Sequence, residues 1–176
     1  MIPSDHFVYF YNEVFKFLRE QGPDALEAYY ARVADRQADF ALEAFRRDGL
    51  KGMYDYWSRI RVEENCGMDL ELTDDYFRLR MTACPSLAKA LDSDAGACPV
   101  YCDHCPGWCL RVFARAGYWG VYDLVARDRS VCEIWVYADA ALARRKFDAR
   151  AAVRDAGLVQ TNLPRCAEDV APYQSW

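Results

Sequence analysis

The run from Cys66 to Ala83 is Cys-Gly-Met-Asp-Leu-Glu-Leu-Thr-Asp-Asp-Tyr-Phe-Arg-Leu-Arg-Met-Thr-Ala, and apolar residues recur in it at every second position. A period of two is the pattern of a strand with one buried face. The segment 73–75 interrupts the alternation with Thr-Asp-Asp, which is typical of a turn. The run therefore predicts an antiparallel hairpin, and Pro85 ends its second strand.

Before this hairpin the apolar residues follow helical spacing, over residues about 5–20 and about 24–47. Gly22-Pro23 separates the two helices, because proline suits the first turn of a new helix. A short third helix is expected around Trp57. The first 58 residues are therefore predicted to be helical.

Helical spacing returns over residues 106–116, and Gly117 is the expected C-cap. Residues 118–126 and 131–137 predict a second hairpin, and Asp139 predicts the N-cap of a last helix. The last helix carries several basic residues among acidic ones, which is typical of a solvated face.

The order of these elements predicts a single α+β domain over residues 1–176. An antiparallel sheet of about four strands, built from two hairpins, is expected to pack against N-terminal and central helices. Its parts are a helical region (1–58), a hairpin–helix–hairpin region (59–138), and a C-terminal helix and tail (139–176).

The composition narrows the class of protein. The chain has 176 residues, 53% of them hydrophobic, with a formal net charge of −5 and a pI of about 5.1. The acidic balance argues against nucleic-acid binding, and no apolar run approaches the roughly 20 residues that cross a bilayer. The first residues lack the basic and apolar regions of a signal peptide, so a cytoplasmic protein with reduced cysteines is expected. The expected partner is a small-molecule substrate or ligand, and the oligomeric state is left open.

Cysteine is concentrated in the run from Cys98 to Cys109, Cys-Pro-Val-Tyr-Cys-Asp-His-Cys-Pro-Gly-Trp-Cys. This run holds four of the eight cysteines and one of the two histidines. Thiolates and imidazoles are good metal ligands and nucleophiles, so the segment is the first candidate for a functional site.

A metal site is one interpretation of the segment. Cys102 and Cys105 have the spacing of a metal-binding knuckle, and a tetrahedral site needs two further ligands. Cys84, at the end of a strand, and Cys132, on the inward face of the last strand, are the candidates. Zinc is the cofactor that these four thiolates would hold. Cys66 is interpreted as a core residue and Cys166 as a bystander in the tail.

Nucleophilic catalysis is the other interpretation. Cys102 and Cys105 fall where a helix should start, and a helix N-terminus lowers the pKa of a nearby thiol. His104 is a candidate general base or metal ligand, and Asp103 is the candidate orienter or proton carrier. The predicted catalytic residues are Asp103, His104 and Cys105. Both interpretations need a thiolate, so the residues alone do not separate them.

Three stretches carry a resemblance to a known family. These are 80–85 (Arg-Met-Thr-Ala-Cys-Pro), 101–105 (Tyr-Cys-Asp-His-Cys) and 131–134 (Val-Cys-Glu-Ile). Over residues 24–138 the chain resembles the bacterial L-2-amino-thiazoline-4-carboxylic acid hydrolase-like family, and more distantly the 4-vinyl reductase-like small-ligand domains. It departs from the pattern in its richer Cys-Asp-His-Cys arrangement and in lacking a Gly-Asp turn before Cys132. The resemblance implies an α+β fold and a hydrolase of a cyclic C–N bond.

Three functions follow as hypotheses. The first is a hydrolase of a cyclic or amidine-like C–N bond, acting through a cysteine thiolate or through a metal-bound water. The second is a zinc-stapled small-ligand-binding or sensor module without catalysis. The third is a redox or iron–sulfur role, since Cys-x-x-Cys motifs also serve those purposes.

Overall fold

The computed structural model describes residues 3–164 of the chain, with their side chains from His6 onward. Its centre is one antiparallel sheet with the strand order β1-β2-β4-β3-β5. The strands are β1 (Gly67–Leu72), β2 (Tyr76–Ala83), β3 (Trp119–Asp123), β4 (Cys132–Tyr137) and β5 (Val159–Thr161). Cys166 lies outside the described residues.

Both predicted hairpins are present, and the pairing of β2 with β4 joins them into one sheet. Leu79 lies opposite Ile134 and Met81 opposite Cys132 in this central ladder. The α+β class is confirmed, but the described residues contain five strands where about four are predicted. The additional strand, β5, has only three residues and pairs with β3. So short a segment carries no alternation that a sequence pattern could reveal.

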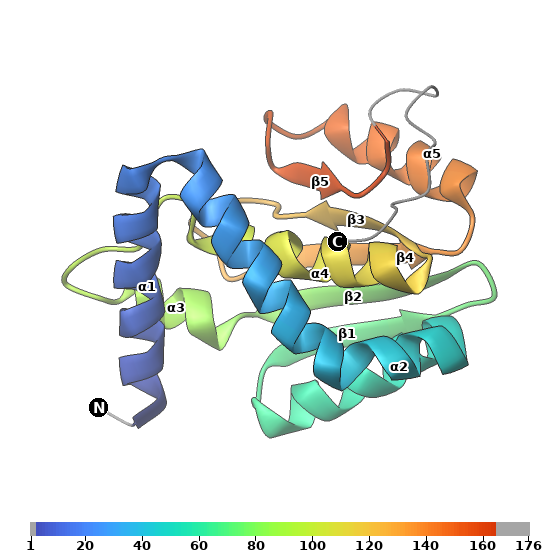
Figure 1. The fold of residues 1–176 in the computed structure, drawn as a ribbon, viewed down its shortest axis with the longest axis horizontal. Helices are drawn as coiled ribbons and strands as arrows, with labels where there is room; N and C mark the ends of the chain where they lie inside the picture. The colour runs from blue at the N-terminus through green and yellow to red at the C-terminus, as the bar shows by residue number, and fades with distance from the viewer. Residues whose placement is uncertain (1–2, 165–176) are drawn as a thin grey trace.

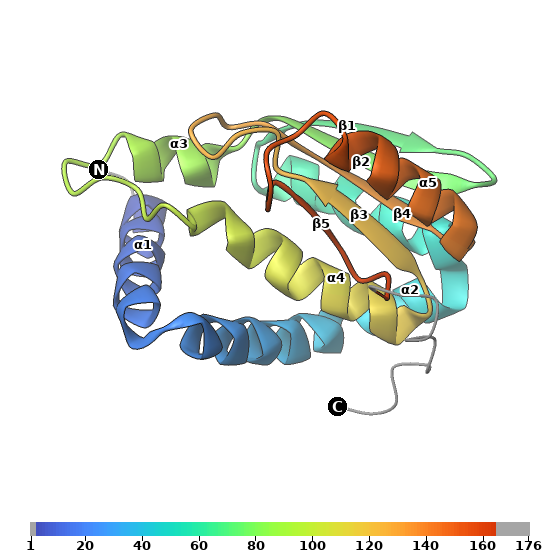
Figure 2. The same ribbon diagram turned by 90° about the horizontal axis from the view of Figure 1, so that it is seen from above.

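The helices form layers on the two faces of the sheet (Figures 1 and 2). They are α1 (Pro3–Gln21), α2 (Pro23–Glu63), α3 (Pro85–Leu91), the 3-10 turn η1 (Tyr101–Asp103), α4 (His104–Ala116) and α5 (Ala140–Ala151). Helices α2 and α4 cover one face of the sheet and α5 covers part of the other, while α1 and α3 lie at one end of the molecule (Figure 2). Within residues 3–164, no helix combines the length and apolar character needed to span a bilayer.

Helix α2 contains both the helix predicted over residues 24–47 and the short helix predicted around Trp57, with a kink between them at Gly49. There the backbone has φ 61° and ψ −136°, which is not helical. Glycine adopts this conformation without the steric cost that a Cβ imposes. The kink turns the second half of α2 back over the sheet, as Figure 1 shows, so that Trp57 reaches the core.

An aromatic stack joins α2, α4 and the sheet. The Trp57 ring lies 5.6 Å from Phe45, 5.6 Å from Phe77 and 5.8 Å from Phe113, measured between centroids. All four residues are buried. Aromatic side chains bury large apolar areas, so this stack fixes α4 between α2 and the sheet.

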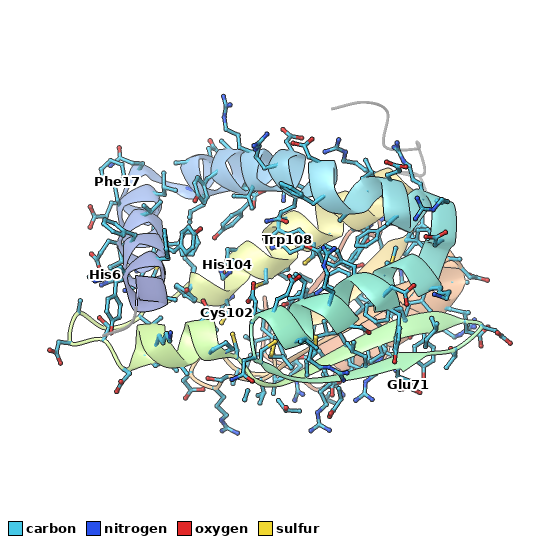
Figure 3. All side chains as sticks on the ribbon, turned by 90° about the horizontal axis from the view of Figure 1, so that it is seen from below. His6, Phe17, Glu71, Cys102, His104 and Trp108 are labelled. Atoms are coloured by element: carbon cyan, nitrogen blue, oxygen red, sulfur yellow. The ribbon has the colours of Figure 1, made fainter. Side chains whose placement is uncertain are left out.

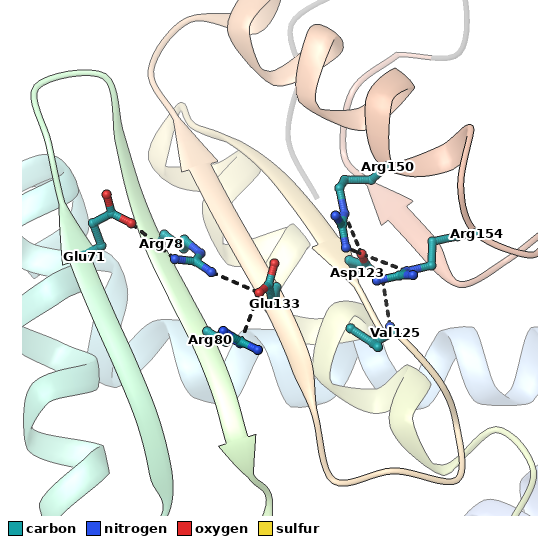
Figure 4. A network of polar contacts seen from close by, with 8 residues as sticks. All are labelled: Glu71, Arg78, Arg80, Asp123, Val125, Glu133, Arg150 and Arg154. Carbon is teal, nitrogen blue, oxygen red and sulfur yellow. Dashed lines mark hydrogen bonds and ion pairs between the residues drawn. The ribbon is translucent and has the colours of Figure 1, made fainter.

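On the opposite face, a buried carboxylate fixes α5 (Figure 4). Asp123 of β3 is 0% exposed, and its carboxylate accepts hydrogen bonds from Arg150 Nε at 2.7 Å, Arg154 Nε at 3.0 Å and the Val125 amide at 2.7 Å. Burial alone raises the pKa of Asp123, but the bonds from Arg154 and Arg150 outweigh it and hold that pKa below its usual value. The basic residues of the last helix are therefore in part a clamp, which corrects the expectation of a wholly solvated face.

Removing the Asp123 charge should destabilise the fold. Asp123→Asn leaves two guanidinium groups without their carboxylate, and we expect a loss of about 2–4 kcal/mol in the free energy of unfolding at pH 7. A carboxylate whose pKa is lowered by folding stabilises the fold at pH values above its unfolded pKa of about 3.9, and this stabilisation is lost as the carboxylate takes up a proton at lower pH. The difference in free energy of unfolding between wild type and variant should therefore shrink below about pH 4. Urea unfolding at several pH values measures both.

Asp148→Asn is the matched control, because Asp148 is an exposed carboxylate on α5 itself. We expect it to change stability little. An equal decrease in the free energy of unfolding for the two variants would contradict the assignment of Asp123 as the clamp.

Candidate functional site

The candidate site is built at the start of α4. The 3-10 turn η1 leads directly into α4, so Cys102, Asp103, His104 and Cys105 lie on successive positions of one tight bend. Helix α4 ends as predicted, at Gly117 with φ 86°. Figure 3 shows Cys102, His104 and Trp108 along η1 and the first part of α4, next to α1.

Cys105 and His104 form a direct pair. The Cys105 Sγ lies 3.3 Å from His104 Nε2, and the Nδ1 of the same ring is hydrogen-bonded to the carbonyl oxygen of Tyr101. A carbonyl only accepts, so Nδ1 carries the proton. Nε2 therefore offers its lone pair to the Cys105 thiol, which donates. This is the arrangement of a nucleophile with its general base and a third group that orients the base.

Two aromatic rings hold the imidazole in place. Phe15 of α1 stacks on His104 with centroids 5.2 Å apart, and Tyr101 meets it edge-on at 5.2 Å. Burial lowers the pKa of His104, although the bond to the Tyr101 carbonyl acts in the opposite direction. The imidazole is thus neutral near pH 7, as a general base must be before it takes a proton.

Tyr122 of β3 connects Cys105 to the sheet. Its hydroxyl lies 3.5 Å from Cys132 Sγ, and a hydrogen bond from the same hydroxyl acts to lower the pKa of Cys105. Tyr122 is buried on the sheet face that α4 covers, and its hydroxyl interacts with both thiols. A donor in this position stabilises a thiolate on either sulfur.

The predicted cysteines gather in one neighbourhood. The charge states of Cys84, Cys102 and Cys105 all act on the pKa of Cys132, and those of Cys84 and Cys105 act on Cys102. All four are partly buried. Cys84 also has a structural role, because its sulfur accepts from the Leu87 amide at 3.4 Å and caps α3.

The thiols are protonated, which corrects the expectation of a depressed pKa. Burial raises the pKa of Cys105 to about 11 and that of Cys102 to about 12, and it raises the pKa of Cys132 and Cys109 as well. A helix N-terminus favours a thiolate, but desolvation of these sulfurs is the larger effect. The Cys105–His104 pair is therefore a neutral thiol and a neutral imidazole at rest.

The geometry of the described residues does not support a zinc site. Across residues 3–164, no three or more His, Cys, Asp or Glu side chains form a group that could hold a metal ion. The four-cysteine site of Cys84, Cys102, Cys105 and Cys132 remains a prediction.

Asp103 is hydrogen-bonded to residues outside the Cys105–His104 pair. Its Oδ1 accepts from Arg127 Nη1 at 2.8 Å and from Gln160 Nε2 at 2.9 Å, which ties η1 to the loop after β3 and to β5. The Tyr101 carbonyl, not Asp103, orients His104. Asp103 is therefore not the orienter of His104, because its carboxylate is bound to Arg127 and Gln160, while its alternative role as a proton carrier stays a prediction.

A groove of about 1200 Å³ lies beside α4 on the same side as Asp103. Its lining includes Tyr30, Arg111, Phe147 and Gln160, from α2, α4, α5 and β5. The Tyr30 hydroxyl is buried without a hydrogen-bond partner among the described residues. The groove therefore combines apolar walls with polar groups, as small-molecule sites do.

Two residues of the site, Tyr122 and Phe15, are not predicted from the sequence. Tyr122 sits in a strand pattern in which an inward tyrosine is indistinguishable from a core residue. Phe15 belongs to a helix about 90 positions away along the chain, and only the tertiary fold stacks it on His104. No local signal identifies either of them.

Comparisons with known proteins add no relatives: no family model matches the chain, and neither a curated protein nor a solved structure matches it.

The raised thiol pKa predicts a pH profile for alkylation. Iodoacetamide reacts with the thiolate, so labelling of Cys105 should be slow at pH 7 and should still be rising above about pH 8.5, the ordinary thiol pKa. Tyr122→Phe removes the hydroxyl that lowers the Cys105 pKa and should slow labelling further at a given pH. Peptide mapping by mass spectrometry assigns the rate to Cys105.

Tyr54→Phe is the matched control, because Tyr54 packs in the same core against Phe77. It should leave the Cys105 profile unchanged. Labelling that has levelled off by pH 8 would show that the thiol is activated at rest, contrary to this account.

Proposed function

We propose that this protein is a hydrolase of a cyclic or amidine-like C–N bond in a small molecule, with Cys105 as the nucleophile and His104 as the general base. The observation that carries the proposal is the 3.3 Å contact between Cys105 Sγ and His104 Nε2, with Nδ1 held by the Tyr101 carbonyl. A cysteine thiol acts on such carbons only when a base can take its proton.

In the proposed reaction, His104 Nε2 takes the thiol proton as the Cys105 sulfur bonds to the amidine carbon. The carbon becomes tetrahedral, and its C–N bond then breaks. The departing nitrogen receives the proton from His104, and a thioimidate remains on Cys105. Water, deprotonated by His104, attacks this carbon, and the sulfur leaves with the proton as the original thiol. Every proton that leaves the thiol or water passes through one nitrogen.

The other groups support this chemistry in separate ways. The Tyr122 hydroxyl points at sulfur and stabilises negative charge on Cys105 as the proton leaves. Phe15 and Tyr101 keep the imidazole from rotating, so Nε2 stays oriented toward Cys105 Sγ. The neutral resting pair requires proton transfer within the transition state, so the base contributes directly to the rate.

The direct test is hydrolysis of 2-amino-thiazoline-4-carboxylate, a cyclic amidine of the class that the family resemblance suggests. Wild type should consume it, and Cys105→Ser and His104→Asn should each lose about 10²–10⁴-fold in kcat/KM. His104→Asn retains a side-chain N–H that can bond to the Tyr101 carbonyl, so the variant tests the lost Nε2 base with limited disturbance of the turn.

Cys66→Ser is the control, because Cys66 is a partly buried thiol at the entry to β1. It should retain wild-type turnover. Hydrolysis that survives Cys105→Ser would exclude Cys105 as the nucleophile.

A small-ligand-binding module without catalysis is the second candidate, and the groove beside α4 favours it. The same assay separates the two. Saturable binding of the amidine by wild type and by Cys105→Ser, with turnover by neither, would favour binding alone.

A further inference from the structure

The outer side of α1 is strongly apolar. Its five large apolar side chains on this side are Phe7, 63% exposed, Phe10, 68%, Tyr11, 48%, Val14, 37%, and Phe17, 60%. We call these five residues the α1 apolar face. They are half of the ten exposed large hydrophobic side chains among the described residues, so the exposure is concentrated on one helix rather than scattered.

The inner side of α1 is already occupied. Asn12 accepts from the Cys98 amide at 2.7 Å and donates to the Gly96 carbonyl at 2.8 Å, and Phe15 stacks on His104. These contacts fix the rotation of the helix about its axis. The α1 apolar face therefore cannot turn inward without breaking them. Figure 1 shows α1 at one end of the molecule, and in Figure 3 Phe17 points away from the neighbouring helices.

The spacing along α1 suits contact with another helix. Positions 7, 10, 14 and 17 are separated by three, four and three residues, which is the spacing of a helix-packing seam. At a rise of 1.5 Å per residue the stripe is about 15 Å long. A straight stripe of this length matches a second helix laid along it.

We propose that the α1 apolar face is the interface of a homodimer, in which α1 packs against α1 of a second copy about a two-fold axis. Aromatic side chains bury about 150–250 Å² each, so at these exposures the face presents about 500 Å². Two copies together bury about 1,000 Å², the level at which specific interfaces begin. An isologous contact needs only the one face that the chain already has.

The charges on α1 disfavour a lipid surface as the occupant. Residues 3–21 contain three acidic residues and only two basic ones. One of these, Lys16, is already bound to Glu13 and to the Ala95 carbonyl. Helices that lie in anionic membranes carry a polar face rich in lysine and arginine. A second copy needs no such charge.

Molar mass in solution tests the proposal. Sedimentation equilibrium of the full chain at micromolar to hundred-micromolar concentrations should give twice the 20.3 kDa of one chain. The double variant Phe10→Glu/Phe17→Glu should give the mass of one chain, because four carboxylates would face one another in the dimer. Phe40→Glu is the matched control: Phe40 is 70% exposed but lies on α2, and the variant should remain dimeric.

A milder pair, Phe10→Ser/Phe17→Ser, guards against misfolding and should raise the dissociation constant while retaining the wild-type circular dichroism spectrum. Wild-type protein that has the molar mass of one chain at every concentration would overturn the proposal. If that monomer also floats with phosphatidylserine-containing vesicles, the face serves a lipid surface instead. A double glutamate variant that is folded and still dimeric would place the interface elsewhere and equally overturn it.

Discussion

The close packing of α4 between α2 and the sheet is the constraint on which the rest of the structure depends. Glycine permits it on both sides. A Cβ on Gly107 would lie 2.7 Å from the ring of Tyr30, and one on Gly120 of β3 would lie 2.7 Å from Leu110. At these distances a methyl group would force the Tyr30 ring or the Leu110 side chain to shift from its packed position. The position of α4 in turn fixes where η1 ends and where His104 and Cys105 point.

This packing also decides the chemistry that the site can perform. Because α4 is pressed against the sheet, the sulfurs near its start are removed from water, and desolvation raises their pKa more than the helix N-terminus lowers it. The pair at rest resembles a serine hydroxyl with its histidine more than the ion pair of an activated cysteine. Helix α1 supports the same pair from outside through Phe15, so the helix that we assign to dimer contact also holds the base in place.

Local patterns in the sequence predict the local structure well. The hairpin alternation, the end of α4 at Gly117 and the Asp139 cap, which accepts from the Ala141 amide at 2.6 Å, are all confirmed. Two features that depend on long-range contacts are not predicted: the clamp of Asp123 with Arg150 of α5 and with Arg154 just after this helix, and the strand β5. His104 and Cys105 are predicted as candidates, but their contact is not, because adjacent side chains on a helix point apart. It forms because His104 is the first residue of α4 and its Nδ1 turns back to the Tyr101 carbonyl.

The tautomer of His104 tests the central claim most directly. The chain has only two histidines, so long-range proton–nitrogen correlation spectra of ¹⁵N-labelled protein contain two imidazole patterns, one of them from exposed His6. We predict that His104 is neutral at pH 7 with the proton on Nδ1, and that Cys105→Ala shifts the Nε2 resonance. A proton on Nε2, or an imidazolium at pH 7, would leave no lone pair for the Cys105 thiol and would contradict the account.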